Sequence, residues 1–261
     1  MEKWQDNKIS HDNYWGKLLN HVNNNPLEIK DVVQQWVDLF KFELGNKSKF
    51  TYIDKGQRLT VDFINYAKNK NKSLQNVLDK HVTENTDVII DLGSGWGRHS
   101  IQLSFMNEGY NLIAGELSDS GQKITKFFTD KYNLPIESFP FNWHEPDSLI
   151  ELLSGRDYKE VVLFSSNSIE QIPHLPIDLF DRICNLPINK ITGVHIEPVG
   201  FQYDNTPFPF SNHYNKNMKE VLETSESNGK LEVINVDRKY YGHNTSVVAN
   251  NNTLIEWVKL L

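Results

Sequence analysis

The chain of 261 residues has little cysteine and no long apolar run. Its single cysteine, Cys184, excludes an internal disulfide and any cysteine-rich zinc site. No uninterrupted apolar stretch approaches the roughly 20 residues that span a bilayer, and the first residues lack the apolar core of a signal peptide. Hydrophobic residues make up 38% of the chain and charged residues 23%, which excludes wholesale disorder. We therefore expect a folded cytoplasmic protein without a membrane partner.

A basic surface is also lacking. The formal net charge is -7, whereas proteins that bind duplexes carry a basic face to neutralise phosphates. The lysines are spread along the chain, and the densest group, at 68–72, lies in an Asn-rich stretch. The charge balance argues against nucleic acid as the main partner, and nothing in the sequence indicates an oligomeric state.

The spacing of apolar residues along the chain changes near residue 85. Before that point, apolar residues recur at helical spacing in three stretches, at 32–40, 59–67 and 74–82, separated by breaks rich in Asn, Lys and Gly. We predict that residues 1–85 form a helical cap and that residues 86–261 form a second domain.

Short apolar runs alternate with segments of helical length after residue 85. The predicted strands are 88–90, 111–115, 161–164 and 191–196, and the predicted helices are 98–108, 120–131 and 177–186. This alternation predicts a doubly wound α/β domain with a mostly parallel sheet. Two long strands, 230–241 and 245–261, predict an antiparallel hairpin at the edge of that sheet.

The most informative segment is the glycine loop after the 88–90 strand. Gly93, Gly95 and Gly97 form the pattern GxGxG, and Asp91 stands two residues before the first glycine. Glycine lets the backbone approach a ligand closely, but a dinucleotide fingerprint has the different spacing GxGxxG. Glu116 ends the next strand, where α/β nucleotide sites place an acid on a ribose. The competing interpretations are a tight turn without a ligand and a solvated glutamate.

This loop resembles that of class I S-adenosylmethionine-dependent methyltransferases, and the resemblance extends from Thr86 to the C-terminus. It implies a seven-stranded sheet that closes with an antiparallel hairpin, and S-adenosyl-L-methionine as cofactor. It also implies that Asn142 contacts the adenine amino group while Trp143 packs on the ring, although Trp143 is equally compatible with the core. The residues expected to bind the cofactor are Asp91, Gly93, Ser94, Gly95, Trp96, Gly97, Glu116, Leu117, Asn142, Trp143 and Ser165.

The loop after the 161–164 strand faces the transferable methyl group in the family that the chain resembles. Here it is dense in polar groups and lacks the Asn-Pro-Pro-Tyr-type signature of enzymes that methylate adenine in DNA or glutamine in proteins. Ser166, Asn167 and Glu170 are candidate acceptor-binding residues. A helix N-cap formed by Ser166 or Ser168 is compatible with that role.

His195 and Glu197 lie two residues apart near the end of the 191–196 strand, so their side chains point to the same side. A histidine there could act as general base, and Glu197 with Glu170 could bind a cationic amine or guanidinium. We therefore name Glu170, His195 and Glu197 as candidate catalytic residues. The alternatives are a satisfied core histidine and a solvated glutamate at a strand end.

The predicted helical cap is rich in aromatic residues and is expected to cover the active site. Tyr14 and Tyr52 are its candidate substrate-binding residues, although packing between helices would also account for them. An enclosed pocket favours a small-molecule substrate. The nine histidines are scattered, and the sequence predicts no metal site.

Together these features predict a methyltransferase of the small-molecule branch that acts on a polar acceptor. N-methylation of an amine or guanidine, in an amino acid or a specialised metabolite, is favoured. The alternative is O-methylation with His195 as general base. More distant alternatives are RNA or protein methylation and a non-catalytic module that binds the cofactor, and the glycine spacing disfavours a nicotinamide-dependent enzyme.

Overall fold

The computed structural model describes residues 3–24, 49–54, 57–106, 109–204, 214–243 and 251–260. Its strands are β1 (Lys49–Asp54), β2 (Gln57–Asp62), β3 (Val88–Leu92), β4 (Leu112–Glu116), β5 (Ile136–Pro140), β6 (Glu160–Ser166), β7 (Lys190–Glu197), β8 (Leu231–His243) and β9 (Asn251–Lys259). Its helices are α1 (Lys3–Asn24), α3 (Phe63–His81), α4 (Arg98–Met106), α5 (Asp119–Tyr132), α6 (Asp147–Ser154), the 3-10 turn η1 (Ile169–Gln171), α7 (Leu179–Cys184), α8 (Phe201–Asp204) and α9 (Met218–Ser227).

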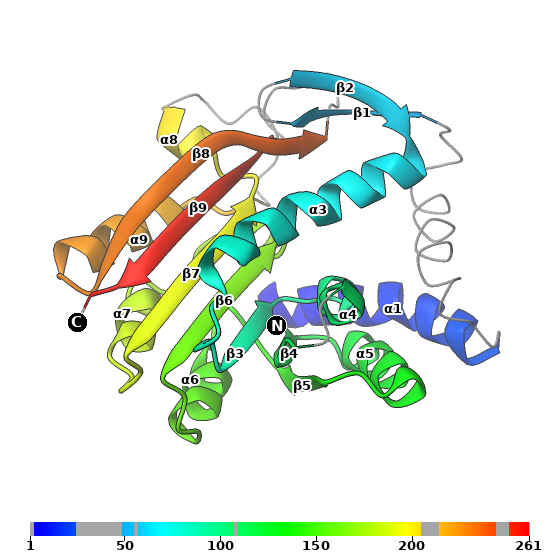
Figure 1. The fold of residues 1–261 in the computed structure, drawn as a ribbon, viewed down its shortest axis with the longest axis horizontal. Coiled ribbons are helices and arrows are strands. Elements are labelled where there is room, and N and C mark those ends of the chain that lie inside the picture. The colour runs from blue at the N-terminus through cyan, green and yellow to red at the C-terminus, as the bar shows by residue number, and fades with distance from the viewer. Residues whose placement is uncertain are drawn as a thin grey trace.

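The described strands form one sheet in the order β2-β1-β8-β9-β7-β6-β3-β4-β5 (Figure 1). Strands β7, β6, β3, β4 and β5 are parallel, and β9 runs antiparallel to both β7 and β8. The predicted seven-stranded sheet with an antiparallel C-terminal hairpin is therefore confirmed for β8 through β5. The runs of buried apolar residues in β3 and β4 fit strands that helices cover on both faces.

The prediction of helices alone before residue 85 is wrong for residues 49–62. Strands β1 and β2 form an antiparallel hairpin there, and β1 pairs with the end of β8, which extends the sheet to nine strands. Leu59 and Val61 alternate with polar neighbours at the strand period of two, and the helix begins only at Phe63. The stretch predicted at 32–40 lies outside the described residues, and the domain division at residue 85 remains a proposal.

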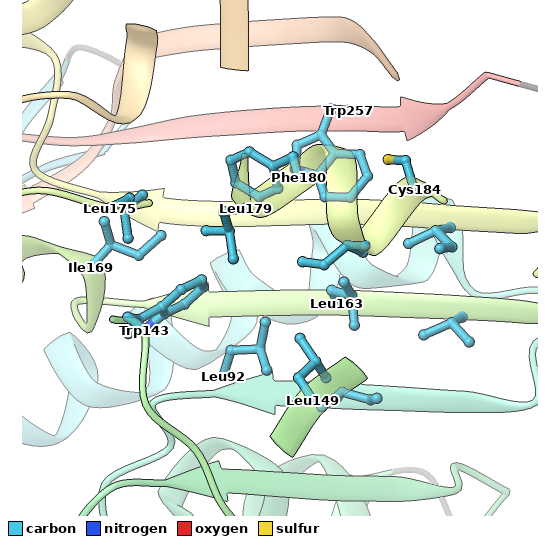
Figure 2. Packing of buried hydrophobic residues seen from close by; sticks show 14 of the residues in the cluster. Leu92, Trp143, Leu149, Leu163, Ile169, Leu175, Leu179, Phe180, Cys184 and Trp257 are labelled. Atoms are coloured by element: carbon cyan, nitrogen blue, oxygen red, sulfur yellow. The ribbon is translucent and has the colours of Figure 1, made fainter. Parts of the chain in front are cut away.

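Two hydrophobic clusters cover the two faces of the sheet. Helices α1, α3, α4 and α5 contribute to one cluster, and α6, α7 and α9 contribute to the other. Side chains of β3 alternate between them, since Ile89 joins the first cluster while Ile90 and Leu92 join the second. Figure 2 shows the second cluster, in which Trp257 of β9 packs against Phe180 of α7 with ring centroids 5.2 Å apart.

The connectivity creates a crevice at the carboxyl end of β3. The chain passes from β3 to β4 on one side and returns through β6 on the other side, so the loops after β3 and β6 diverge from each other. Open α/β sheets bind ligands at such a switch point. Helix α1 packs against α5 on the same face as α4 (Figure 1).

Candidate functional site

The turn after β3 requires glycine at three alternate positions. Gly93, Gly95 and Gly97 have φ angles of 76°, 60° and 76°, in the left-handed region that side chains disfavour. The N–H groups of Gly93 and Ser94 both donate to the carbonyl of Gly115 in β4, at 2.8 and 2.9 Å. The loop is thus fastened to the neighbouring strand, and the glycine spacing reflects backbone geometry.

Glu116 at the end of β4 holds the other side of this loop. Its carboxylate accepts the N–H of Gly95 at 2.9 Å and both the N–H and hydroxyl of Ser118 at 2.9 and 2.6 Å. Burial raises the pKa of Glu116, and the hydrogen bonds from Ser118 and Gly95 oppose that rise. Glu116 as a whole is only 4% exposed, so it is a fixed part of the wall and not a solvated strand end.

A cavity of about 510 Å³ opens at the carboxyl ends of β3, β4, β5 and β6. The glycine loop, the end of β4 and the loop after β6 form its walls, and the sequence analysis singled out all three segments. Of the predicted site residues, the cavity is lined by Tyr14, Gly93, Ser94, Gly95, Trp96, Glu116, Leu117, Asn142, Trp143, Ser166 and Asn167.

Asn142 and Trp143 follow β5 and form one wall of the cavity. The side-chain oxygen of Asn142 accepts the N–H of His144 at 3.0 Å, which fixes the orientation of the amide. Trp143 is buried, packs edge-on against Phe141, and donates its indole N–H to the hydroxyl of Ser168 at 3.2 Å. Trp143 therefore belongs both to the core (Figure 2) and to the cavity wall.

The loop after β6 is held in one conformation from several sides. Asn167 has a φ of 57°, and its amide pairs with the amide of Asn252 at 3.1 and 3.2 Å. The hydroxyl of Ser168 donates to the carbonyl of Leu92 at 2.8 Å, which ties this loop to the glycine loop. Asn215 donates to the carbonyls of Glu170 and Ile172 from outside.

His195 is fully buried and does not line the cavity. Its Nε2 accepts the indole N–H of Trp257 at 3.0 Å, so the ring proton resides on Nδ1, which is 2.9 Å from the hydroxyl of Ser165. Burial lowers the pKa of His195 to about 3. In this geometry the imidazole offers no nitrogen to an acceptor in the cavity, and it is satisfied within the core.

Glu197 is also fully buried, behind the loop after β6. Its oxygens accept the hydroxyl of Ser165 at 2.8 Å and the N–H groups of Ser168 and Glu170 at 3.1 and 3.3 Å. Burial raises the pKa of Glu197 to about 7, with a contribution from the nearby charge of Glu170. The carboxylate shapes the loop and does not face the cavity.

Several other predicted residues also lie outside the lining of the cavity. The carboxyl group of Asp91 accepts the hydroxyl of Ser100 at 3.1 Å, and burial raises its pKa to about 7. Gly97 packs against α5, where a Cβ would come within 2.5 Å of the Thr125 hydroxyl. Ser165 and Glu170 do not line the cavity either, and the side chain of Tyr52 lies outside the described residues.

Helix α1 supplies a wall whose residues the sequence analysis did not single out, apart from Tyr14. Its cavity-lining residues recur at helical spacing, which is the signal that could have revealed them: Asn7, His11, Tyr14, Trp15, Lys17 and Leu18. Further unpredicted lining residues are Arg98, His99, Phe141, Ser168, Gln171 and Ile172. The sequence predicts that the N-terminal segment covers the site, but it does not indicate which residues of α1 meet the glycine loop.

The position of α1 is fixed at both sides of the cavity. Asp12 accepts the N–H and the hydroxyl of Ser120, at 2.9 and 2.6 Å, in the first turn of α5. On the other side, His11 Nε2 lies 2.6 Å from Gln171 Oε1, in the loop after β6. Helix α1 therefore spans the crevice from α5 to the loop after β6.

Within the described part of the chain, no group of three or more His, Cys, Asp or Glu side chains could hold a metal ion. Among the same residues, no helix is both long and apolar enough to cross a membrane.

The fold and site define a doubly wound α/β protein with a ligand cavity between a GxGxG turn and an acidic strand end. No family model and no curated protein matches the chain. Solved structures do align with it. One is a SAM-dependent methyltransferase from Aquifex aeolicus. The alignment covers 74% of this chain and 98% of that chain, at 12% sequence identity and a TM-score of 0.45.

Another similar structure is geranyl diphosphate C-methyltransferase from Streptomyces coelicolor A3(2), in complex with Mg²⁺, geranyl diphosphate and S-adenosyl-L-homocysteine. It shows 12% identity, covers 72% of this chain and 77% of that chain, and has a TM-score of 0.45. A geranyl diphosphate methyltransferase in complex with GPP and sinefungin aligns at 12% identity over 76% of this chain and 79% of that chain, with a TM-score of 0.47.

Proposed function

We propose that the protein is an S-adenosylmethionine-dependent methyltransferase that acts on a polar small molecule. The observation that carries this proposal is the pairing of Gly95 with Glu116, because it brings a GxGxG turn and a strand-end carboxylate to the same cavity. A cofactor bound there would supply a methyl group on a positively charged sulfur, which is already activated for transfer.

The residues present fit such a cofactor. The glycine turn leaves room that a Cβ would fill, and the Glu116 carboxylate suits the hydroxyl groups of a ribose. The Asn142 amide offers both a donor and an acceptor to the edge of an adenine ring. Two polar atoms of cavity-lining residues, Ser94 Oγ and Trp15 Nε1, are buried without a hydrogen-bond partner in the described chain. A polar ligand in the cavity could supply the missing hydrogen bonds.

The shape of the cavity supports a small acceptor. Helix α1 covers the crevice, and a volume of about 510 Å³ suits a cofactor together with a compact substrate. The predicted preference for a cationic amine or guanidine depended on Glu170 and Glu197, neither of which lines the cavity. N-methylation of such a cation is therefore less well supported than transfer to a neutral polar group.

Methyl transfer to a metabolite mixture tests the proposal. The purified protein is incubated with a polar metabolite extract and S-adenosylmethionine carrying a labelled methyl group, and products are separated by mass spectrometry. We expect at least one extract component to gain the labelled methyl group with the wild type and not with Gly95→Val. Cofactor binding without any labelled product would favour a non-catalytic binding module.

A further inference from the structure

We propose that His11 is the general base for the methyl acceptor, and that the acceptor is a small molecule methylated on a hydroxyl oxygen. This inference rests on the proposed methyltransferase function and specifies its substrate class. His11 lies on α1 and lines the cavity opposite the loop after β6, which contributes Gln171.

The contact with Gln171 orients the imidazole and determines its tautomer. His11 Nε2 lies 2.6 Å from Gln171 Oε1. With Gln171 Oε1 as the acceptor in this contact, the ring proton resides on Nε2. Nδ1 is then the unprotonated nitrogen, and among the described residues it has no hydrogen-bond partner. A base held at one nitrogen and open at the other is the arrangement that general-base catalysis requires.

The other titratable groups that line the cavity are either engaged or unsuited to act as a base. Glu116 accepts three hydrogen bonds within the wall. His99 Nε2 lies 2.6 Å from a guanidinium nitrogen of Arg98. Lys17 and Arg98 are cationic side chains and Tyr14 carries a phenol, so none of the three is suited to take a proton from a hydroxyl group. Within the described lining, His11 is the remaining base.

The charges around the cavity favour a neutral acceptor. A cationic amine or guanidinium would need a carboxylate beside it, but Glu116 is the one carboxylate within the described lining, and it lies at the ribose position of the proposed cofactor site. Lys17 and Arg98 would repel a cation. A hydroxyl group carries no charge, and it becomes a competent nucleophile when a base removes its proton.

The proposed step uses His11 as the proton acceptor. In the step that we propose, the hydroxyl proton passes to His11 Nδ1 while an oxygen lone pair forms the bond to the methyl carbon. The bond between carbon and sulfur breaks, and its electron pair stays on sulfur.

The first test measures the tautomer without any acceptor. Nitrogen NMR of histidine-labelled protein, saturated with S-adenosylhomocysteine, distinguishes a protonated ring nitrogen from an unprotonated one. We expect neutral His11 to be protonated at Nε2 in the wild type, and we expect the Gln171→Leu variant to lose that preference. A wild-type imidazole protonated at Nδ1 would overturn the proposal. Absence of S-adenosylhomocysteine binding would instead contradict the proposed function itself.

The second test is chemical rescue of His11→Ala with added imidazole, on a panel of phenols and aliphatic alcohols with S-adenosylmethionine. We expect turnover to fall at least about a hundredfold and imidazole to restore part of it, while affinity for S-adenosylhomocysteine changes less than about threefold. The exposed His174 provides the control, because His174→Gln should turn over normally. Activity of His11→Ala within about twofold of wild type would overturn the proposal, as would wild-type methylation of amines alone or of no member of the panel.

Discussion

The indole ring of Trp15 lies directly against Gly95: a Cβ at Gly95 would come within 3.1 Å of Trp15 Cζ2. One residue comes from the glycine turn after β3 and the other from α1, eighty positions earlier in the chain. Because both line the cavity, this contact joins the proposed cofactor site to the helix that covers it.

Substitution of Gly95 by valine should abolish cofactor binding. A side chain there meets Trp15 and adopts a strained φ of 60°, at a cost of about 1–3 kcal/mol for the backbone alone. We expect the affinity for S-adenosylhomocysteine, measured by calorimetry, to fall at least about a hundredfold while the protein stays folded.

Gly229 provides a matched control for the backbone strain. It has a φ of 66°, and a Cβ there would meet nothing within 4 Å. Gly229→Val should therefore carry similar strain and keep wild-type affinity. Equal loss of binding in the two variants would show that strain, and not the glycine turn at the cavity, is responsible.

Removal of the Asp12 carboxylate should loosen α1 over the cavity. Asp12 accepts two hydrogen bonds from Ser120 in the first turn of α5, and it pairs with Lys8 at 3.0 Å. A carboxylate at a helix N-terminus contributes roughly 0.5–2 kcal/mol. We expect Asp12→Ala to increase hydrogen exchange across residues 3–24 and to speed S-adenosylhomocysteine dissociation severalfold. Asp130→Ala, which removes an exposed ion pair on α5, should change neither quantity.

Glu197 should contribute more to the stability and shape of the loop after β6 than to the affinity for the cofactor. Glu197→Gln keeps one oxygen that can accept from the Ser165 hydroxyl and the Ser168 N–H, but it places an amide NH₂ against the N–H of Glu170. Mispaired buried groups cost about 1–3 kcal/mol each. We expect the free energy of unfolding in denaturant to drop by about 1–3 kcal/mol, and turnover to fall much more than cofactor affinity. Glu151→Gln, at an exposed position of α6, should retain wild-type stability within about 0.5 kcal/mol; an equal loss in both variants would contradict this account.

Asp91 should make the protein less stable as the pH rises. Burial raises the pKa of its carboxyl to about 7 from an ordinary value of 3.8. Between these values the native carboxyl keeps a proton that the unfolded chain has lost, so the unfolding free energy falls as pH increases and levels off above about 7. The total loss from this group is on the order of 4 kcal/mol.

Denaturant unfolding of Asp91→Asn at about pH 4 and about pH 8 measures this contribution. We expect the stability difference between the two conditions to shrink by several kcal/mol, with Glu197 responsible for part of the remainder. Asp157→Asn, at an exposed position, serves as control. An unchanged pH dependence in Asp91→Asn would show that the buried carboxyl does not titrate in this way.

The sequence predicts the parts of the site that depend on local pattern. A buried apolar run followed by GxGxG and then by Glu116 requires only neighbouring residues, and the structure places Glu116 against Gly95. The hairpin of β1 and β2 was missed because Leu59 and Val61 also fit a helical spacing with Phe63 and Ile64. A period of two becomes evident only when those later residues are assigned to α3.

The roles of buried polar residues depend on partners that are distant in sequence. His195 and Glu197 do point to the same side of β7, as predicted, but that side meets Trp257 of β9 and Ser165 of β6. Spacing along one strand gives no information about the neighbouring strands. For the same reason the contact between His11 and Gln171 could not be predicted, since the two residues are 160 positions apart, although helical spacing marks the face of α1 on which His11 lies.

Calorimetric titration of the purified protein with S-adenosylmethionine, S-adenosylhomocysteine and NAD tests the central claim most directly. The account predicts that the two sulfur compounds bind with micromolar affinity, and that NAD gives no binding heat because GxGxG is not the dinucleotide spacing. Glu116→Ala should lower the affinity for both sulfur compounds by at least about tenfold. Absence of binding by either compound, or tighter binding of NAD, would contradict the proposed function.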